Sequence, residues 1–322
     1  MDISFVVPCY NAEKTIEKCL NSILSQDIGI ANFEIIVVDN NSTDSSASII
    51  LGFDNKVKYV EEKSQGRSFA RNTGAHHAKG EFLAFVDADV YLDISWAKIL
   101  KKSFDENKNV GAGQGQIIPC RDHGTKSLND YRYRCVNEET DGRFILTEIK
   151  RFEFPMINTA ACMYRKDIFN EVKGFDIYLE RHEDIDLSRR AFLYGQSISC
   201  STDATAHVIF HGESWLDYFK RSFDDGYYKG AYLEKWEGMP LTIKNVTPNK
   251  KIDFVKWFLS QFKNVIVNLS FHELLVLLLN ATNAYGRFYG RIHYFYPGKK
   301  MQLKLGPQGF GQVYIDQKAI CE

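Results

Sequence analysis

Short β-branched runs alternate with amphipathic runs over the first 117 residues, and this alternation constrains the fold more than any other feature. The β-branched runs are typical of buried strands, and in the amphipathic runs apolar residues recur at helical spacing. The predicted strands cover residues 3–7, 33–38, 57–60, 82–86 and 110–118, and the predicted helices cover residues 12–25, 67–79 and 95–107. Repeated strand–helix units predict an α/β fold with a mostly parallel sheet and helices on both faces.

Polar clusters follow three of these strands at the point where each strand ends. They begin at Pro8, Asp39 and Asp87. Ligands of open parallel sheets bind beyond the carboxyl ends of the strands. We therefore expect the three clusters to converge on one edge of the sheet and to form one site.

The later part of the chain has a less regular pattern. Residues 157–164 predict another strand, 183–194 a helix, and 197–210 one or two strands, whereas 119–155 resemble a long loop. Beyond them, apolar residues at spacings of three and four between 254 and 269 predict mostly helix. Residues 205–322 carry 15 basic and 10 acidic side chains, so this aromatic-rich segment is positively charged.

Asp87-Ala88-Asp89 closes the strand at 82–86 and places two carboxylates one residue apart. Such a pair can face a divalent cation and a sugar hydroxyl together, and Mn²⁺ or Mg²⁺ is the expected ion. The same three-residue pattern recurs at Asp184-Ile185-Asp186, so by itself it also fits a solvated turn.

No glycine-rich phosphate loop of the GxGxxG or GxxxxGK[ST] type stands at a strand–helix junction. A nucleotide would instead be bound by side chains, with Asp39 on the base or ribose and Arg67 or Arg71 on phosphate. From spacing alone, either arginine also fits a charge on a helix surface.

Charge and cysteine content restrict the partners and the compartment. The chain has 322 residues with 40 basic and 41 acidic side chains, and the net charge of −1 gives no reason to expect nucleic-acid binding. The seven cysteines show no metal-binding spacing, which favours free thiols in a reducing compartment. Since no signal-peptide pattern or bilayer-length apolar run is visible, we expect a cytoplasmic protein, with peripheral contact at the inner face of the membrane as an open possibility.

Five stretches of the chain, in order and spacing, resemble the inverting family-2 glycosyltransferases of GT-A fold. They are VVPCYNAEKTIEKCLNSILSQ (6–26), FEIIVVDNNSTDSS (33–46), SQGRSFARNTGAHHAKGEFLAFVDADV (64–90), INTAACMYRKDIFNEVKGFD (157–176) and HEDIDLSRRAFLYG (182–195). The ordered set covers nearly all of residues 3–195 and is specific as a whole.

The resemblance implies a role for each matching residue. Pro8, Tyr10 and Asp39 would line the nucleoside pocket, Asn41 and Arg71 would be further nucleotide contacts, Asp87 would hold the ribose, and Asp89 would bind the metal. Glu183-Asp184 matches an acidic pair at a helix start whose Asp acts as general base. His211 matches a late metal-binding histidine better than His207 does, although a core histidine remains an alternative for it.

The resemblance also implies a metal-dependent, inverting transfer of a hexosyl or N-acetylhexosaminyl group. The donor would be a nucleoside-diphosphate sugar, most readily a UDP-sugar, and the acceptor a hydroxyl on a glycan, lipid-linked or protein substrate. A non-catalytic sugar-nucleotide-binding module is the alternative, because binding alone does not need Asp184.

We expect residues 1–215 to form the catalytic domain, with a nucleotide-binding half (1–117) and an acceptor-binding half (118–215). Residues 216–322 would form a C-terminal helical extension. It would serve as a lid, as a membrane contact or as a packed subdomain.

Overall fold

The structure, a computed structural model, describes residues 1–121, 156–210, 215–236, 278, 281–286, 304–305 and 313–314. Its strands are β1 (Ile3–Cys9), β2 (Phe33–Asp39), β3 (Lys58–Glu61), β4 (Phe82–Val86), β5 (Val90–Leu92), β6 (Val110–Arg121), β7 (Ala161–Arg165), β8 (Ser197–Phe210), β9 (Lys304–Leu305) and β10 (Val313–Tyr314). Its helices are α1 (Ile16–Leu24), α2 (Ser46–Leu51), α3 (Arg67–His77), α4 (Trp96–Glu106), α7 (Lys166–Glu171), α8 (Glu183–Leu193) and α9 (Trp215–Lys235).

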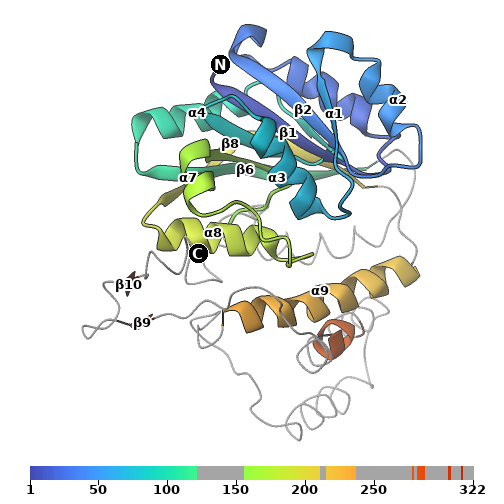
Figure 1. Ribbon diagram of the computed structural model, residues 1–322, viewed down its shortest axis with the longest axis vertical. Helices are drawn as coiled ribbons and strands as arrows, with labels where there is room; N and C mark the ends of the chain where they lie inside the picture. The colour runs from blue at the N-terminus through green and yellow to red at the C-terminus, as the bar shows by residue number, and fades with distance from the viewer. Residues whose placement is uncertain are drawn as a thin grey trace, which may run out of the picture.

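Eight strands form one mixed sheet in the order β3-β2-β1-β4-β7-β6-β8-β5. The first half is parallel, as predicted, since β1 pairs in parallel with β2 and β4, and β2 with β3. In the second half β7 runs antiparallel to both β4 and β6, and β5 antiparallel to β8. The molecule is thus an α/β Rossmann-like domain with helices packed around the sheet (Figure 1). The antiparallel β7 brings its first residues to the carboxyl end of β4.

Helices cover both faces of the sheet. Successive residues of a strand point to opposite faces, and in these strands the residues on both faces are apolar. On one face Phe5 and Val7 of β1 pack in a cluster with Trp96 and Leu100 of α4. On the other, Val6 packs in a second cluster with residues of α3, α7 and α8. A Cβ at Gly74 of α3 would lie 2.3 Å from Val6 Cγ1, so this helix packs with its bare backbone against β1.

The structure corrects several predicted boundaries. The strand expected at 157–164 begins only at Ala161, because the Asn158 side chain accepts a hydrogen bond from the Ala160 N–H (2.9 Å) and forms a turn. The helix expected at 12–25 begins at Ile16. The sequence analysis missed β5, α2 and α7, each of which is six residues or shorter.

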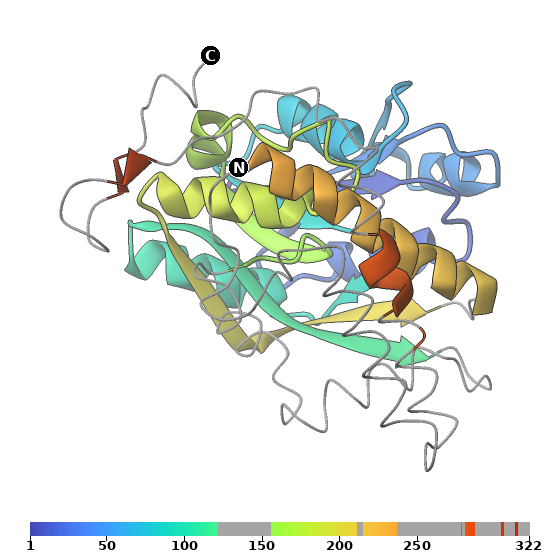
Figure 2. The ribbon, with the colours of Figure 1, turned by 90° about the horizontal axis from the view of Figure 1, so that it is seen from below.

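The long strands β6 and β8 pair in parallel along most of their length (Figure 2). The register shifts between Gly115 and Gln116, whose partners are Ser201 and Thr205, and β8 bulges there. At the bulge a Cβ on Gly115 would lie 1.8 Å from the Ala204 carbonyl oxygen, so only glycine fits. The region predicted as one or two strands is therefore one irregular strand.

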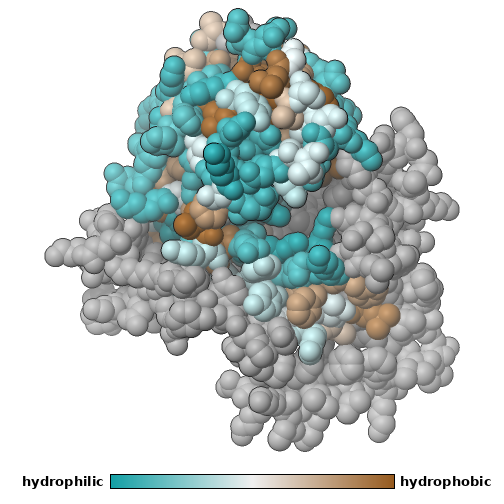
Figure 3. Space-filling view, turned by 45° about the vertical axis from the view of Figure 1, so that its right-hand side comes forward, coloured by the Kyte–Doolittle hydropathy of each residue, from teal (hydrophilic) through white to brown (hydrophobic). Residues whose placement is uncertain are grey.

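Helix α9 lies beside α8 in both ribbon views (Figures 1 and 2), and side chains of the two helices make direct contacts. Among the described helices, none combines the length and apolar character that crossing a membrane requires. On the face seen in Figure 3 the described surface is mostly hydrophilic, with hydrophobic residues in small separate groups. The predicted helical run at 254–269 lies outside the described residues, and the division into domains stays a prediction.

Candidate functional site

The carboxyl ends of the parallel strands meet at one edge of the sheet, as the sequence predicts. Cys9 of β1 pairs with Asp39 of β2, and Asp39 pairs in turn with Glu61 of β3. Since β4 also runs parallel to β1, Asp87, which follows β4, lies at the same edge. Three polar clusters that are far apart in the sequence thus border one site.

Asp39 is buried at this edge, 6% exposed, and both of its carboxylate oxygens have partners. Oδ2 accepts a hydrogen bond from the Tyr59 hydroxyl (2.9 Å), and Oδ1 accepts one from the Ser42 N–H (3.0 Å). Burial and the neighbouring Asp39 carboxylate raise the pKa of Tyr59, so its hydroxyl stays a donor. Beside Asp39, Pro8 is half-buried and Tyr10 is 55% exposed, which leaves the Tyr10 ring open to a ligand.

Two consecutive asparagines after Asp39 organise the loop that leads into α3. Asn41, with a left-handed backbone (φ 65°), donates from Nδ2 to the Lys63 carbonyl (2.9 Å). Asn40 is buried, donates to the carbonyls of Glu62 (2.8 Å) and Ser64 (2.7 Å), and accepts from the Gly66 N–H (2.7 Å). The sequence analysis missed Asn40, whose only signal was its place directly after a strand-ending aspartate.

Arg71 of α3 joins the two acidic clusters. It is 2% exposed, and it donates from Nη1 to Glu183 Oε1 (2.9 Å) and from Nη2 to Asp87 Oδ1 (2.6 Å). Burial disfavours its charge, but the two carboxylates outweigh burial and hold the pKa of the guanidinium above its usual value. Two of its nitrogens are thus bound to protein carboxylates, whereas the sequence analysis places Arg71 on the nucleotide.

Arg67 lies one turn earlier on α3 and is 51% exposed, with Nη1 3.8 Å from Glu183 Oε1. Its guanidinium therefore reaches the same acidic cluster from the solvent side. Of the two arginines proposed for phosphate, Arg67 has the exposed position that a ligand can reach.

Asp87 and Asp89 present carboxylates at the turn between β4 and β5. The Asp87 side chain is 30% exposed although it binds Arg71, and Asp89 is exposed. Crowding by surrounding protein and the negative charge of Asp87 raise the pKa of Asp89 to about 6, although Arg221 of α9 and Arg67 oppose this shift. Arg221 is a residue near this site that the sequence analysis missed, because it follows Asp89 by more than 130 positions.

These two carboxylates fit a divalent cation. Surrounding protein and then the Asp87 charge raise the pKa of Asp89, and the nearby arginines offset this only in part. Among the described residues no group of three or more His, Cys, Asp or Glu side chains is arranged to hold a metal ion. Mg²⁺ and Mn²⁺ are commonly held by one or two carboxylates together with substrate phosphates, so a two-carboxylate site suits either ion.

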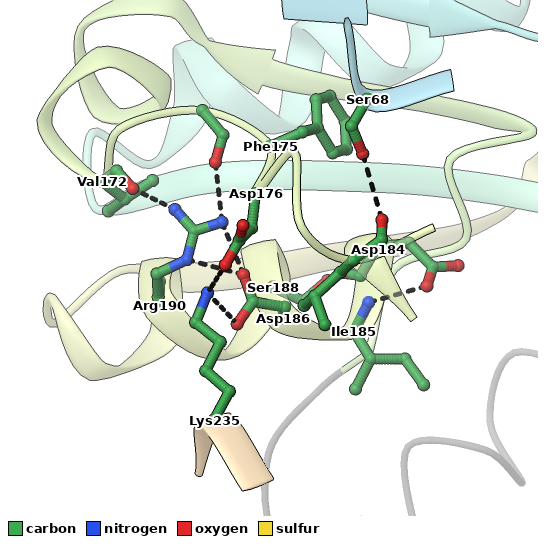
Figure 4. A network of polar contacts seen from close by, with 12 residues as sticks. Ser68, Val172, Phe175, Asp176, Asp184, Ile185, Asp186, Ser188, Arg190 and Lys235 are labelled. Atoms are coloured by element: carbon green, nitrogen blue, oxygen red, sulfur yellow. Dashed lines mark hydrogen bonds and ion pairs between the residues drawn. The ribbon is translucent and has the colours of Figure 1, made fainter. Parts of the chain in front are cut away.

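Glu183 and Asp184 begin α8, as predicted. Glu183 is 3% exposed and is held by Arg71, whereas the half-buried Asp184 accepts at Oδ1 from the Ile185 N–H (2.8 Å). In Figure 4 the Asp184 carboxyl points away from Asp186 and Arg190 of the same helix. Burial and the Glu183 charge raise the pKa of Asp184 to about 7, against the opposing effect of Arg71 and Arg67.

The structure describes only one of the two histidines considered as metal ligands. His207 contacts Asp93 through Nε2 (2.9 Å) and the Cys120 thiol through Nδ1 (3.4 Å), and its ring stacks on Tyr91. Both of its nitrogens therefore have protein partners. His211, the preferred candidate, lies outside the described residues.

The chain matches a known protein family. The family model described as "Glycosyl transferase family 2" matches residues 4–173. The glycosyltransferase GlyA of Streptococcus pneumoniae is 38% identical over 242 residues, which cover 73% of this chain and 32% of GlyA. The chain thus spans about a third of the length of GlyA.

Solved structures share the fold at low sequence identity. Residues 1–349 of TarS from S. aureus in complex with UDP-GlcNAc superpose with a TM-score of 0.52 at 19% identity, covering 91% of each chain. The mannosyltransferase PcManGT of Pyrobaculum calidifontis, in complex with GDP-Man and Mn²⁺, gives a TM-score of 0.52 at 18% identity and covers 90% of this chain and 73% of its own.

Proposed function

Because the chain belongs to glycosyl transferase family 2, we propose that it is an enzyme that transfers a sugar from a nucleoside-diphosphate sugar to a hydroxyl acceptor, with inversion at the anomeric carbon. One observation carries the proposal most directly. The buried Arg71 binds Asp87 after β4 and Glu183 at the start of α8. It thereby joins the donor edge of the sheet, the edge at the carboxyl ends of the parallel strands, to the acidic pair Glu183-Asp184.

The donor side of the site suits a nucleoside diphosphate. Asp39, Pro8, Tyr10 and Asn41 border the position of the base, Asp87 that of the ribose, and the exposed Arg67 that of the phosphates. A UDP-sugar with an N-acetylglucosamine group is our first choice of donor, because the fold neighbour TarS is complexed with UDP-GlcNAc.

A divalent cation, Mn²⁺ or Mg²⁺, would be held by Asp89 together with the diphosphate. His211 is a further proposed ligand. Such an ion neutralises charge that builds on a departing diphosphate. The exposure and raised pKa of Asp89 support this assignment, as does the Mn²⁺ in the complex of PcManGT.

The chemical step needs a base on the acceptor side. In a single displacement the acceptor oxygen forms a bond to the anomeric carbon while the bond from that carbon to the diphosphate oxygen breaks on the opposite face. The nucleoside diphosphate leaves, and Asp184 takes the proton of the acceptor hydroxyl. A carboxyl with a pKa of about 7 is a stronger base than an ordinary aspartate, which suits proton removal near neutral pH.

The acceptor would be a hydroxyl on a glycan, a lipid-linked or a protein substrate. A relative from Staphylococcus aureus, 39% identical over 111 residues, is named poly(ribitol-phosphate) beta-N-acetylglucosaminyltransferase TarS, and this supports a polymeric acceptor. A peripheral membrane contact through the C-terminal segment stays a prediction, because most of that segment lies outside the described residues.

A donor panel tests the proposal. We expect hydrolysis or transfer with at least one UDP-sugar in the presence of Mn²⁺ or Mg²⁺, and loss of it in EDTA that either ion restores. Replacing Asp89 with Asn is expected to weaken the apparent affinity for Mn²⁺, measured as a rise of about tenfold or more in the Mn²⁺ concentration for half-maximal rate. Calorimetric binding of a donor with no turnover across many acceptors would favour the non-catalytic binding module.

The acid side of the pH profile is a separate prediction. Because Asp184 accepts a proton only when ionised, and its pKa of about 7 is that of the ligand-free site, kcat/KM is expected to halve near pH 7 and to fall about tenfold for each unit further below it. The profile is measured at saturating Mn²⁺, so that titration of Asp89 does not contribute. An acid limb centred near pH 4, the range of an ordinary aspartate, would contradict the role of Asp184.

A further inference from the structure

Helix α9 ends in a cluster of charges that reaches the first turn of α8. Lys235 Nζ lies 2.6 Å from Asp176 Oδ2 and 2.7 Å from Asp186 Oδ1, and the Trp236 indole N–H donates to the same Asp186 oxygen (2.8 Å). Figure 4 shows Lys235 entering this cluster from below, opposite Arg190. Asp186 stands two residues after Asp184 on the same helix.

The cluster is closed to solvent and its charges are matched. Asp186 is completely buried, and its second oxygen is bound by Arg190 Nε (2.9 Å) and Nη2 (2.7 Å). Burial by itself would raise the pKa of Asp186, but Arg190 and Lys235 outweigh it and hold the pKa below its usual value. Removing Lys235 would therefore leave a buried carboxylate short of one cation, a strongly unfavourable state.

Another part of α9 holds the backbone directly before Glu183. Asp225 forms an ion pair with Arg181, and the Asp225 carbonyl contacts His182 Nε2 (3.1 Å). His182 has a left-handed backbone (φ 66°), which costs energy in a residue other than glycine and persists only where surrounding contacts fix it. The Tyr228 hydroxyl donates to Glu180 Oε2 (2.6 Å). Helix α9 therefore contacts three consecutive residues, 180–182, directly before Glu183.

These contacts bracket Asp184. Glu183 is fixed directly by Arg71, but the Asp184 carboxyl accepts its hydrogen bond from Ile185, a backbone group of the same helical turn. The direction of the Asp184 carboxyl therefore follows the position of the first turn of α8. That turn is held before Glu183 by Asp225 and after Asp184 by Lys235 and Trp236.

We propose that α9 and the residue after it position the proposed catalytic base: Lys235 and Trp236, through Asp186, and the Asp225 side chain, through Arg181, hold the first turn of α8 so that Asp184 faces the acceptor. This inference rests on the proposed function for the role of Asp184. Lys235, Trp236 and Asp225 are positioning residues and have no contact with substrate in this assignment. A structural role alone would stabilise the fold without affecting the chemical step of folded molecules.

The test compares Lys235→Met, Lys235→Arg, Trp236→Phe and Asp225→Asn with the unchanged chain. Lys98→Met is the matched control, because it removes the Lys98–Asp27 ion pair of 2.7 Å on the exposed side of α4. The readouts are kcat and donor KM per folded molecule, the midpoint of the acid limb, and amide hydrogen exchange of peptides covering 180–187.

Lys235→Met is expected to lower kcat by about 10²-fold, to change donor KM by less than about threefold, and to move the acid limb. The rate of amide hydrogen exchange of residues 180–187 should rise at least about tenfold. Trp236→Phe and Asp225→Asn should act in the same direction but more weakly, and Lys235→Arg should recover most of kcat. Lys98→Met should leave all readouts unchanged.

Two results separate this inference from the proposed function. If the unchanged chain turns over no donor, the proposed function fails, while the exchange of residues 180–187 still decides whether α9 holds this turn. If the chain is active and Lys235→Met has parental kcat per folded molecule, an unmoved acid limb and parental exchange, the positioning role is wrong. Should Lys235→Met not fold, Trp236→Phe, which keeps an aromatic ring but has no N–H donor, decides by the same readouts.

Discussion

Replacing Asp184 with Asn is expected to lower kcat by about 10²–10⁴-fold, the usual contribution of a general base. The amide keeps the shape of the side chain but cannot accept the acceptor proton. Donor KM should change little, because the proposed nucleotide contacts lie on the other side of Arg71. The measurement is single-turnover transfer with a donor that the unchanged chain uses.

Stability provides the control for Asp184→Asn. The folded state raises the pKa of Asp184 above its unfolded value, so the ionised carboxylate opposes folding once the pH exceeds the unfolded pKa. At pH 8 the neutral amide removes this penalty, and the thermal midpoint of the variant should be equal to or above that of the unchanged chain. Loss of activity together with a lower midpoint would instead indicate a structural role.

Replacing Arg71 with Met is expected to have the largest effect on stability. It leaves the buried Glu183 carboxylate without its short ion pair and Asp87 without its 2.6 Å partner. Removing one member of a buried ion pair costs about 3 kcal/mol, which corresponds to a fall of roughly 4–5 °C in the thermal midpoint for a chain of 322 residues. Thermal unfolding followed by circular dichroism measures the change.

Arg67→Met is the matched control for Arg71→Met, since both arginines approach the same Glu183 oxygen. Arg67 is 51% exposed and its nitrogen lies 3.8 Å away, so its loss should cost about 0–1 kcal/mol. Equal destabilisation by the two substitutions would contradict the central role of Arg71. Arg67→Met should also raise donor KM if Arg67 contacts the phosphates, and so the two arginines have separable effects.

Local pattern was sufficient to predict the donor edge of the sheet. The strands predicted to end before Pro8, Asp39 and Asp87 are short buried runs, and parallel pairing brings their ends together without further information. The helix start at Glu183 was equally visible, because acidic residues precede an amphipathic run. Both predictions depend only on residues that are close in sequence.

Contacts between distant segments were not predictable from one sequence. Arg71 was predicted as a nucleotide contact from the lack of a glycine-rich phosphate loop and from the family resemblance, and nothing near it in the chain indicates Glu183 as a partner. The antiparallel direction of β7 depends on a crossing from β6 through residues outside the described ranges. The same holds for Lys235 and Asp186, whose pairing exists only once α9 lies against α8.

The bonds of Arg71 also bear on the order in which the chain folds. Its partner Asp87 is 16 residues away, whereas Glu183 is 112 residues away. Closing the shorter loop costs less chain entropy than closing the longer one. Because Glu183 belongs to α8, Arg71 gains its second anion only when α8 is in place, and we expect molecules in which α8 has not docked to be disfavoured.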